Sequence, residues 1–414
     1  MNERRAVVIG AGIVGVACAL TLQRDGWRVT LLDPEAPGEG ASKGNAGIIA
    51  VDHTTPLALP GLLPRVPRML LDSQSPLAIR WRYLPRLLPW LARFLAASTP
   101  GRVERISRAL ATLMAGAADA YTPLVEGAGA RELFRRQGVV YVYAGAASFA
   151  RARAEMAIRR RTGVEIEELG AAELGQLVPG LSADITHGAF FPASAHVVDP
   201  HRLVQMLAED LVGRGGTLVK ERAVGFEFRD RAVAGVRTGS GRHGADAVVV
   251  AAGAWSNPLA RRLGVRVPLD TERGYNVTLP APGIELRLPV VSGDFAFALT
   301  PMAMGVRLAG TVEFAGLEAP PDPARSDALI AGARRLFPEI DTSDGTTWMG
   351  CRPSMPDSLP VIGRAPSHPN AFLAFGHGHI GLTTAAITGR AVADLAAGRP
   401  PPLDLSPFRP DRFL

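Results

Sequence analysis

The sequence has 414 residues, of which 47% are hydrophobic and 20% charged. These values are typical of a folded globular protein and exclude a disordered chain. The net charge is +6, but the charge comes from scattered arginines rather than from basic blocks with interleaved aromatic residues, so nucleic-acid binding is not predicted. Cys18 and Cys351 predict neither a disulfide framework nor a metal site. We also expect no cleaved signal, because the first strand begins by Ala6, and no membrane-spanning helix.

The chain opens with a pattern typical of a nucleotide-binding βαβ unit. An unbroken apolar run from Ala6 to Ile9 predicts a strand buried on both faces of a parallel sheet. Gly10, Gly12 and Gly15 follow at GxGxxG spacing, which allows a sharp turn, a close approach to a pyrophosphate and tight packing of the next helix. We expect the N-terminus of that helix to point its free N–H groups at phosphates.

A second strand is predicted at residues 28–33 and ends on Asp33. This acid follows Gly15 at close to the spacing of about 20 residues at which a carboxylate binds the adenosine ribose. GxGxxG alone also occurs in purely structural turns. The order of strand, turn, helix, strand and terminal acid favours nucleotide binding over that alternative.

Small residues dominate the next segment, residues 42–48, which contains the pattern Ser-x-x-Asn-Ala-Gly. Such a segment suits a backbone that approaches a ligand closely, although a flexible surface loop has the same composition. Together with the opening glycines, the segment resembles the D-amino acid oxidase superfamily of flavoproteins, most closely the bacterial D-amino acid dehydrogenases.

Residues 53–100 are rich in proline and arginine. Within them the basic, amphipathic stretch 81–95 indicates either a helix that covers a core or a contact with a membrane surface. Helices are predicted at 102–127 and 146–162, with a β-prone segment, 138–143, between them. We expect this insertion to belong to a substrate domain.

The alternation of helix and strand returns after residue 195, with a second buried strand at 245–251 that closes on a small-residue turn. In the superfamily resembled, the backbone near Val224 would contact the adenine side of FAD. The turn at Ala252, Gly253 and Trp255 resembles a second FAD-contacting segment, with a purely structural strand end as the alternative.

Residues 265–345 alternate apolar and polar positions, which predicts an antiparallel sheet with one face over a pocket. The Gly-x-Arg-Pro segment at 350–353 resembles the place where the family positions its carboxylate-binding arginine. A guanidinium can hold an α-carboxylate through two parallel hydrogen bonds. Arg352 is therefore the first candidate for this role, with a solvated arginine in a turn as the alternative. Tyr275 and His53 are weaker candidates for the same pocket.

Residues 375–389 predict a loop that enters a helix, whose positive end would face the negative charge of a reduced flavin. The pattern Gly-His-Gly-His-x-Gly at 376–381 resembles the C-terminal flavin motif of the family, so His379 is a candidate for both the flavin and the substrate pocket. His377 and His379 have no Cys or acid nearby in the sequence, so no metal site is predicted.

The resemblance covers nearly the whole chain and implies an enzyme that transfers a hydride from the α-carbon of an amino acid to non-covalently bound FAD. The implied fold class is α/β, with a discontinuous Rossmann-like FAD-binding domain and a second, α+β substrate domain of antiparallel sheet and helices. The expected bounds are 1–55, 195–264 and 346–414 for the FAD-binding domain and 56–194 and 265–345 for the substrate domain. The residues expected to contact FAD are Gly10, Gly12, Ile13, Val14, Gly15, Asp33, Ser42, Asn45, Ala46, Gly47, Ile48, Val224, Ala252, Gly253, Trp255, Gly378, His379, Ile380, Gly381, Leu382 and Thr383.

The segments 44–49 and 82–85 look most like bacterial D-hydroxyproline dehydrogenases. This narrower resemblance implies cis-4-hydroxy-D-proline or D-proline as substrate and a pyrroline as product. Glycine or sarcosine oxidation is the near alternative, and a non-catalytic flavin subunit of a multi-subunit dehydrogenase is the alternative from another class. The electron acceptor, whether oxygen, a quinone or another carrier, is left open. We expect a cytoplasmic protein, with a peripheral contact at the inner face of the membrane as an open alternative.

Overall fold

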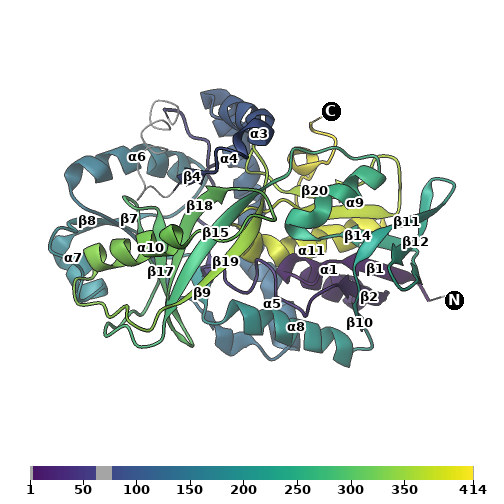
Figure 1. Ribbon diagram of the computed structural model, residues 1–414, viewed down its shortest axis with the longest axis horizontal. Helices are drawn as coiled ribbons and strands as arrows, with labels where there is room; N and C mark the ends of the chain where they lie inside the picture. The colour runs from purple at the N-terminus through teal and green to yellow at the C-terminus, as the bar shows by residue number, and fades with distance from the viewer. Residues whose placement is uncertain (1–2, 62–76, 414) are drawn as a thin grey trace.

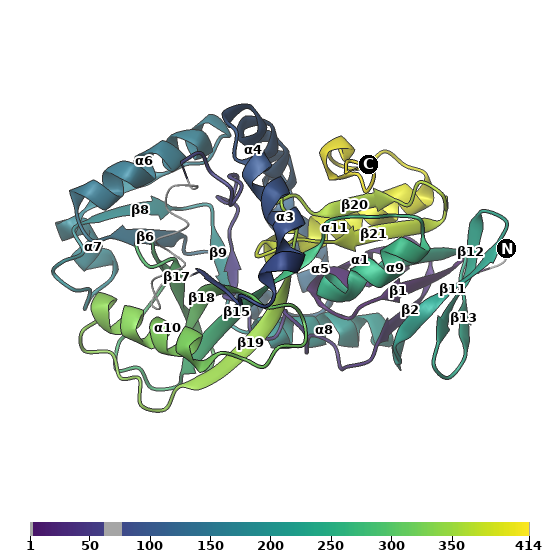
Figure 2. The ribbon, with the colours of Figure 1, turned by 45° about the horizontal axis from the view of Figure 1, so that its top comes forward.

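The computed structural model describes residues 3–61 and 77–413. Residues 62–76 of the predicted substrate domain lie outside this range. Two sheet-centred parts lie side by side, and helix α3 (Leu84–Ala97) lies between them in the second view (Figures 1 and 2). This arrangement confirms the predicted fold class.

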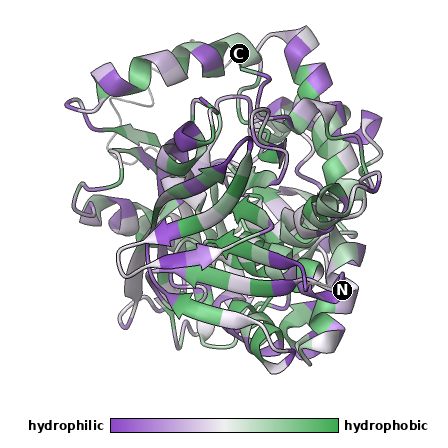
Figure 3. Cartoon of the chain, turned by 90° about the vertical axis from the view of Figure 1, so that its right-hand side faces the viewer, coloured by the Kyte–Doolittle hydropathy of each residue, from purple (hydrophilic) through white to green (hydrophobic). Residues whose placement is uncertain are grey.

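The first part is built on a sheet in the order β10-β2-β1-β14-β21-β20. Five of its strands are parallel, and β20 runs antiparallel to β21. At its centre Val8 of β1 lies between Leu31 of β2 and Val249 of β14. Hydrophobic residues make up much of the strands at this end of the molecule (Figure 3). The strands are β1 (Arg5–Ile9), β2 (Arg28–Asp33), β10 (Thr217–Lys220), β14 (Ala247–Val250), β20 (Val361–Arg364) and β21 (Ala371–Phe375).

Both faces of this sheet are covered, which explains the uninterrupted apolar runs of its strands. One face packs against helices α1 (Ile13–Arg24), α4 (Pro100–Ala115), α5 (Ala117–Gly127), α8 (Pro200–Gly213) and α11 (Gly381–Ala397). The other packs against α9 (Ser256–Arg262) and a small sheet of β11 (Ala223–Arg229), β12 (Ala232–Thr238) and β13 (Arg242–Gly244). Helices α4 and α5 fall within the predicted substrate domain, yet their buried residues belong to the same hydrophobic core as those of α1. The predicted domain bounds therefore stay a proposal.

The predicted helix at 102–127 is two helices, because the chain breaks at Gly116. This residue closes α4 with non-helical backbone angles, and an added Cβ would lie 3.3 Å from Ile387 Cδ1 on α11. Gly116 therefore lets α4 and α5 both approach α11, which a continuous helix could not do.

The second part is built on a large, mostly antiparallel sheet in the order β19-β15-β18-β17-β16-β6-β8-β7, with β4 paired to β18. Helices α6 (Ala146–Arg161), α7 (Ala171–Leu177) and α10 (Pro323–Leu336) belong to this part. Its strands are β4 (Leu77–Ile79), β6 (Val139–Tyr143), β7 (Glu167–Gly170), β8 (His187–Phe191), β15 (Asp270–Leu279), β16 (Val290–Ser292), β17 (Phe297–Met302), β18 (Gly305–Phe314) and β19 (Thr346–Ser354).

Two features of this part differ from the sequence predictions or add to them. Strand β19 pairs with β15 along its length, so residues 346–354 join the large sheet rather than the nucleotide-binding sheet. A further small sheet of β3 (Ile48–Ile49), β9 (Ala195–Val197) and β5 (Phe134–Arg135) connects segments that are far apart in the sequence. Within residues 3–61 and 77–413, none of the helices is both long enough and apolar enough to cross a membrane.

The first glycine turn gives a test of the fold. Gly10 has φ +110°, and an added Cβ would overlap the backbone carbonyl of Ala251. An alanine at this position would be strained by the positive φ and would also overlap the Ala251 carbonyl. We therefore expect Gly10→Ala to lower the free energy of unfolding by about 2 kcal/mol or more. Thermal unfolding followed by circular dichroism measures the change. In the control Gly101→Ala, an added Cβ meets nothing within 4 Å, and we expect no loss. Equal unfolding temperatures for Gly10→Ala and Gly101→Ala would contradict the close packing of Gly10 against Ala251.

Candidate functional site

A cavity of about 1300 Å³ lies between the two parts and touches both. Its volume exceeds that of common small-ligand pockets, which reach about 1000 Å³, and suits a dinucleotide together with a second small molecule. The walls come from the carboxyl ends of β1, β2 and β14, from residues 33–50, from one face of β15, β18 and β19, from α3 and from residues 374–382. Such a position at the carboxyl ends of parallel strands is where open α/β sheets bind ligands.

Nearly all the predicted site residues meet at this cavity. The lining residues among them are Gly10, Gly12, Ile13, Val14, Asp33, Ser42, Asn45, Ala46, Gly47, Ile48, His53, Val224, Ala252, Gly253, Trp255, Tyr275, Arg352, Gly378, His379, Gly381 and Leu382. Three predicted residues do not line it. Gly15 packs against the Gly10 carbonyl, Ile380 lies in the hydrophobic core, and Thr383 Oγ1 accepts a hydrogen bond from Ala50 N at 3.0 Å.

The N-terminus of α1 forms one end of the cavity and is open to an anion. Its N-cap, Gly12, provides no side-chain acceptor, and the first turn has no acidic residue. Ser42 Oγ accepts a hydrogen bond from Ile13 N at 3.0 Å, which fixes the Ser42 segment against the helix. Asp33 Oδ2 accepts from Ala11 N at 2.7 Å and Oδ1 accepts from Glu35 N at 2.9 Å. The carboxylate therefore holds the glycine turn in shape while it lines the cavity.

A second helix N-terminus, that of α11, faces the same space. It also lacks a side-chain cap and an acidic residue in its first turn. Gly378 just before it has φ +53°, and an added Cβ there would meet nothing within 4 Å. His377 is buried, its Nε2 lies 3.1 Å from Thr388 Oγ1, and burial lowers its pKa to about 3. His377 therefore stays neutral and anchors the loop, whereas His379 is exposed and lines the cavity.

Arg352 projects from strand β19, not from a turn, and its guanidinium is held by backbone carbonyls. Nη1 donates to Thr311 O at 3.1 Å and Nη2 donates to Gly310 O at 3.3 Å. A β-bulge lies here, because the register of β15 and β18 shifts between Arg273 and Tyr275. Thr311 has φ +52°, an uncommon value for a residue other than glycine. The bulge thus aims carbonyl oxygens at the guanidinium, and Gly274 leaves room for it, since a Cβ there would overlap Nη2.

Glu272 is the cross-strand neighbour of Arg352 and also lines the cavity. It is 3% exposed, and its Oε1 accepts a hydrogen bond from Ser354 Oγ at 2.5 Å. Burial raises its pKa, against the lowering effects of Ser354 and of the Arg352 charge. Burial conversely lowers the pKa of Arg352, and Glu272 opposes this effect. The pair gives the cavity one fixed cation and one carboxyl that resists ionisation.

Tyr275 lines the cavity, but its hydroxyl is engaged in a buried ion cluster. The hydroxyl donates to Glu313 Oε2 at 2.5 Å and accepts from Asp322 N at 2.9 Å. Glu313 also pairs with Arg273 at 3.1 Å and with Arg80 at 2.6 Å. Burial and Glu313 raise the pKa of Tyr275 to about 12. Its hydroxyl is therefore a fixed structural group at neutral pH.

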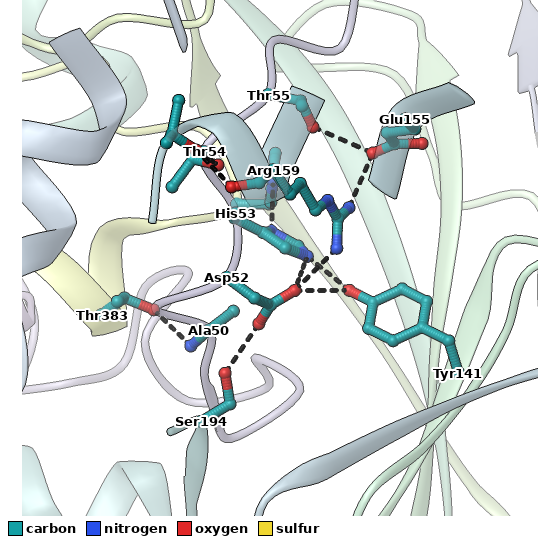
Figure 4. Close-up of polar contacts among 12 residues, drawn as sticks. Ala50, Asp52, His53, Thr54, Thr55, Tyr141, Glu155, Arg159, Ser194 and Thr383 are labelled. Atoms are coloured by element: carbon teal, nitrogen blue, oxygen red, sulfur yellow. Dashed lines mark hydrogen bonds and ion pairs between the residues drawn. The ribbon is translucent and has the colours of Figure 1, made fainter. Parts of the chain in front are cut away.

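His53 belongs to a second polar cluster on the cavity wall (Figure 4). Its Nε2 lies 2.7 Å from the Tyr141 hydroxyl, and its Nδ1 lies 3.1 Å from His379 Nε2. Behind them Arg159 Nη1 donates to Asp52 Oδ2 at 2.8 Å. Sequence reasoning missed Asp52, Tyr141 and Arg159. The only local signals were the alternation of the strand that carries Tyr141 and the position of Asp52 beside His53.

Helix α3 and β18 form an apolar wall, which the sequence left undecided between a core helix and a membrane helix. Trp90 stacks on Phe94 at 5.1 Å between ring centroids, and it packs on Phe314 at 5.2 Å. All three line the cavity. The apolar face of α3 therefore has a partner within the protein.

In the described part of the chain, no group of three or more His, Cys, Asp and Glu residues could hold a metal ion.

The raised pKa of Glu272 predicts the pH dependence of stability. A carboxyl whose pKa is raised by folding destabilises the folded state when it ionises, so this loss grows as the pH rises above its ordinary value of 4.5. We expect Glu272→Gln to raise the unfolding temperature relative to the parent at about pH 8 and not at about pH 4. Glu285→Gln is the matched control, because that side chain is 83% exposed. A pH-independent effect of Glu272→Gln would contradict the prediction.

With this geometry in view, comparisons with known proteins give the family. The family described as DAO, FAD dependent oxidoreductase, matches residues 5–395. The chain is 40% identical to the D-amino-acid oxidase of Bradyrhizobium diazoefficiens, over 99% of both chains. It is 32% identical to D-amino acid dehydrogenase 2 of Mesorhizobium japonicum, over 97% of this chain and 98% of that one.

Solved structures share the fold at low identity. Glycine oxidase from Geobacillus kaustophilus superposes with a TM-score of 0.74 at 21% identity, over 100% of both chains. L-proline dehydrogenase from P. horikoshii gives 0.74 at 20% identity, over 99% of this chain and 98% of that one. The two helix N-termini, which have no acidic residue in their first turns, and the glycine turn fit a dinucleotide. The chain therefore belongs to the FAD-dependent oxidoreductase family and is an FAD-dependent enzyme.

Proposed function

We propose that this enzyme oxidises the α-carbon–nitrogen bond of a D-amino acid and produces an imine. The observation that carries the proposal is the Arg352 guanidinium, which is held on the cavity wall by two carbonyl oxygens instead of a carboxylate. Two of its N–H groups are used in this way, and the others are available to a bound anion. The names of the similar proteins from Bradyrhizobium and Mesorhizobium support a D-amino acid as that anion.

The predicted FAD-binding residues fall at the end of the cavity that carries both helix N-termini. The N–H groups at the start of α1 would hold the pyrophosphate, and the turn at Ala252 and Gly253 would lie along the dinucleotide. The N-terminus of α11 would stabilise negative charge on the isoalloxazine. When bound, FAD supplies the hydride acceptor that the protein side chains lack. The protein holds the substrate carboxylate at Arg352 and excludes water with the apolar wall of α3.

Among D-amino acids we favour D-proline and cis-4-hydroxy-D-proline. The pocket beside Arg352 combines an apolar wall, from Trp90 and Phe314, with polar groups at His53 and His379. A ring with one ionisable nitrogen and a carboxylate suits both surfaces. Glycine and sarcosine remain as alternatives that would leave the apolar wall unused.

We further propose a quinone or another carrier as the electron acceptor. The peripheral membrane contact of α3 stays a prediction, and it is supported by Leu88 on this helix, whose side chain is 55% exposed.

The function is tested by anaerobic addition of D- and L-amino acids, including both hydroxyproline epimers, while the flavin absorbance is followed. We expect bleaching by D-amino acids and none by their L-enantiomers. Arg352→Lys should raise KM about 10- to 150-fold, because a lysine cannot reproduce the bidentate contact. Arg390→Lys, an exposed position on α11, is the control and should leave KM unchanged. A bound flavin that no amino acid bleaches would instead favour a non-catalytic flavin subunit.

We predict that FAD is bound without a covalent link. Cys351 lines the cavity as a free thiol, but burial raises its pKa, so the nucleophilic thiolate is disfavoured. His377 and His379 are held in place by hydrogen bonds to other side chains. Acid precipitation should therefore release all the flavin into the supernatant, where absorbance measures it. Yellow colour that stays with the pellet would identify a covalent link, and Cys351→Ser would then show whether the thiol forms it.

A further inference from the structure

The polar cluster around Asp52 is more elaborate than a structural role requires. Asp52 is 1% exposed and Arg159 is 7% exposed, and buried ion pairs give little net stability. Asp52 Oδ1 accepts a hydrogen bond from Ser194 Oγ at 2.7 Å, and Arg159 also pairs with Glu155 at 2.6 Å. Figure 4 shows these groups gathered around the His53 ring and the Tyr141 hydroxyl. The cluster therefore joins buried charges to a wall of the substrate cavity.

The cluster contains a continuous chain of hydrogen-bonding atoms from the cavity to Asp52. It begins at His379, whose Nε2 lies 3.1 Å from His53 Nδ1. It continues from His53 Nε2 to the Tyr141 hydroxyl at 2.7 Å, and from that hydroxyl to Asp52 Oδ2 at 3.4 Å. His53, Tyr141 and His379 all line the cavity. The second ring nitrogen of His379, Nδ1, is not used in this chain.

Desolvation is the main reason that the pKa values of both imidazoles are lowered, which favours their neutral forms. Burial lowers the pKa of His53, Arg159 adds to this effect, and Asp52 and Glu155 oppose it. The His379 ring is exposed to the cavity, but the surrounding protein still desolvates it and lowers its pKa, and the nearby His53, Arg352 and Arg159 lower the pKa further. Arg352 comes from β19, Arg159 and Glu155 come from α6, and Asp52 precedes His53. A neutral imidazole has one N–H and one lone pair, so such a chain can pass a proton along.

We propose that His379, His53 and Tyr141 form a relay that takes the proton from the ammonium group of the bound amino acid. The proposal rests on the proposed function. A hydride can leave the α-carbon only when the amine is neutral, because the nitrogen lone pair must be free to form the imine bond. The ammonium N–H bond breaks and His379 Nδ1 gains the proton. His379 Nε2 passes its own proton to His53 Nδ1, His53 Nε2 passes one to the Tyr141 oxygen, and Tyr141 passes its proton to Asp52 Oδ2. No group changes its oxidation state in these transfers. The relay resets when water removes the proton from Asp52 after product leaves.

In this relay only His379 contacts the substrate. His53 and Tyr141 conduct the proton, while Arg159 and Ser194 are positioning residues that hold Asp52. The site would therefore bind an amino acid in its abundant ammonium form and deprotonate it in place. This deepens the proposed function, because it gives the site a means of working at neutral pH, where few free amino acids carry a neutral amine.

Tyr141→Phe breaks the relay while it keeps the ring, which packs on Phe191 at 4.9 Å. The probe is D-proline, added anaerobically to the FAD-loaded enzyme from pH 6 to pH 10. We expect the bleaching rate of Tyr141→Phe to fall about 100-fold at pH 7 and less than about threefold at pH 10. The matched control Tyr143→Phe, on the same strand and outside the cavity lining, should follow the parent at every pH. An equal loss at all pH values, or no loss, would overturn the relay.

A second measurement does not depend on turnover. 2-Aminoisobutyrate has no α-hydrogen and cannot be oxidised, and isobutyrate has the carboxylate without the amine. Nitrogen-15 NMR of the histidine rings should show the tautomers of His53 and His379 exchange when 2-aminoisobutyrate binds and stay unchanged when isobutyrate binds. In His53→Gln, used also in case Tyr141→Phe does not fold, the His379 ring should no longer respond.

Comparison of 2-aminoisobutyrate with isobutyrate distinguishes failure of the relay from failure of the proposed function. If both perturb the flavin spectrum and the imidazole tautomers never change, the relay is overturned and the carboxylate site at Arg352 stands. If neither ligand perturbs the flavin spectrum, the proposed function fails and the relay fails with it. If only 2-aminoisobutyrate changes the tautomers in the parent and not in Tyr141→Phe, both proposals are supported.

Discussion

The site depends on how the protein solvates the half-buried guanidinium of Arg352 without neutralising its charge. A guanidinium removed from water needs partners, and a carboxylate partner would cancel its charge. Here the partners of Arg352 are the carbonyls of Gly310 and Thr311, which carry only partial charges. The arrangement needs the bulge in β18 and the space above Gly274. The cavity therefore keeps a positive charge for a ligand, and its neighbour Glu272 is disfavoured as a compensating anion because burial raises its pKa.

The two sheets contribute different kinds of groups to the cavity. The parallel sheet brings the α1 turn, the β14 turn and the α11 entry to one edge, where backbone N–H groups and small residues make a cradle for a dinucleotide. The antiparallel sheet offers a wall to which residues of β15, β18 and β19 contribute. In the proposed function, backbone groups would hold the cofactor, whose phosphates and rings need close approach. Side chains would hold the substrate, whose recognition needs charge and shape.

The sequence predicted what local patterns encode. The apolar run before Gly10, the glycine spacing and Asp33 are short-range signals, and the structure confirms the elements that they imply. Membership of a sheet is not a short-range property, so the sequence did not show that residues 346–354 pair with β15 of the large sheet, and the predicted domain bounds stay a proposal. The partners of Asp52 could not be predicted either, because Arg159 and Ser194 lie 107 and 142 residues away along the chain. Nothing in their own neighbourhoods distinguishes them from other polar residues.

The short strand β3 connects the two halves of the site in a way that has a thermodynamic consequence. Its neighbour Gly47 lines the cavity at the end proposed to hold FAD. Ala50, just beyond the strand, is hydrogen-bonded to α11, and the chain then continues into Asp52 and His53. A ligand that orders this segment from either side reduces the entropy that the second ligand must lose on binding. If ligands order this segment, occupancy of the two proposed subsites would be positively cooperative, and by reciprocity the substrate would tighten flavin binding as much as the flavin tightens substrate binding.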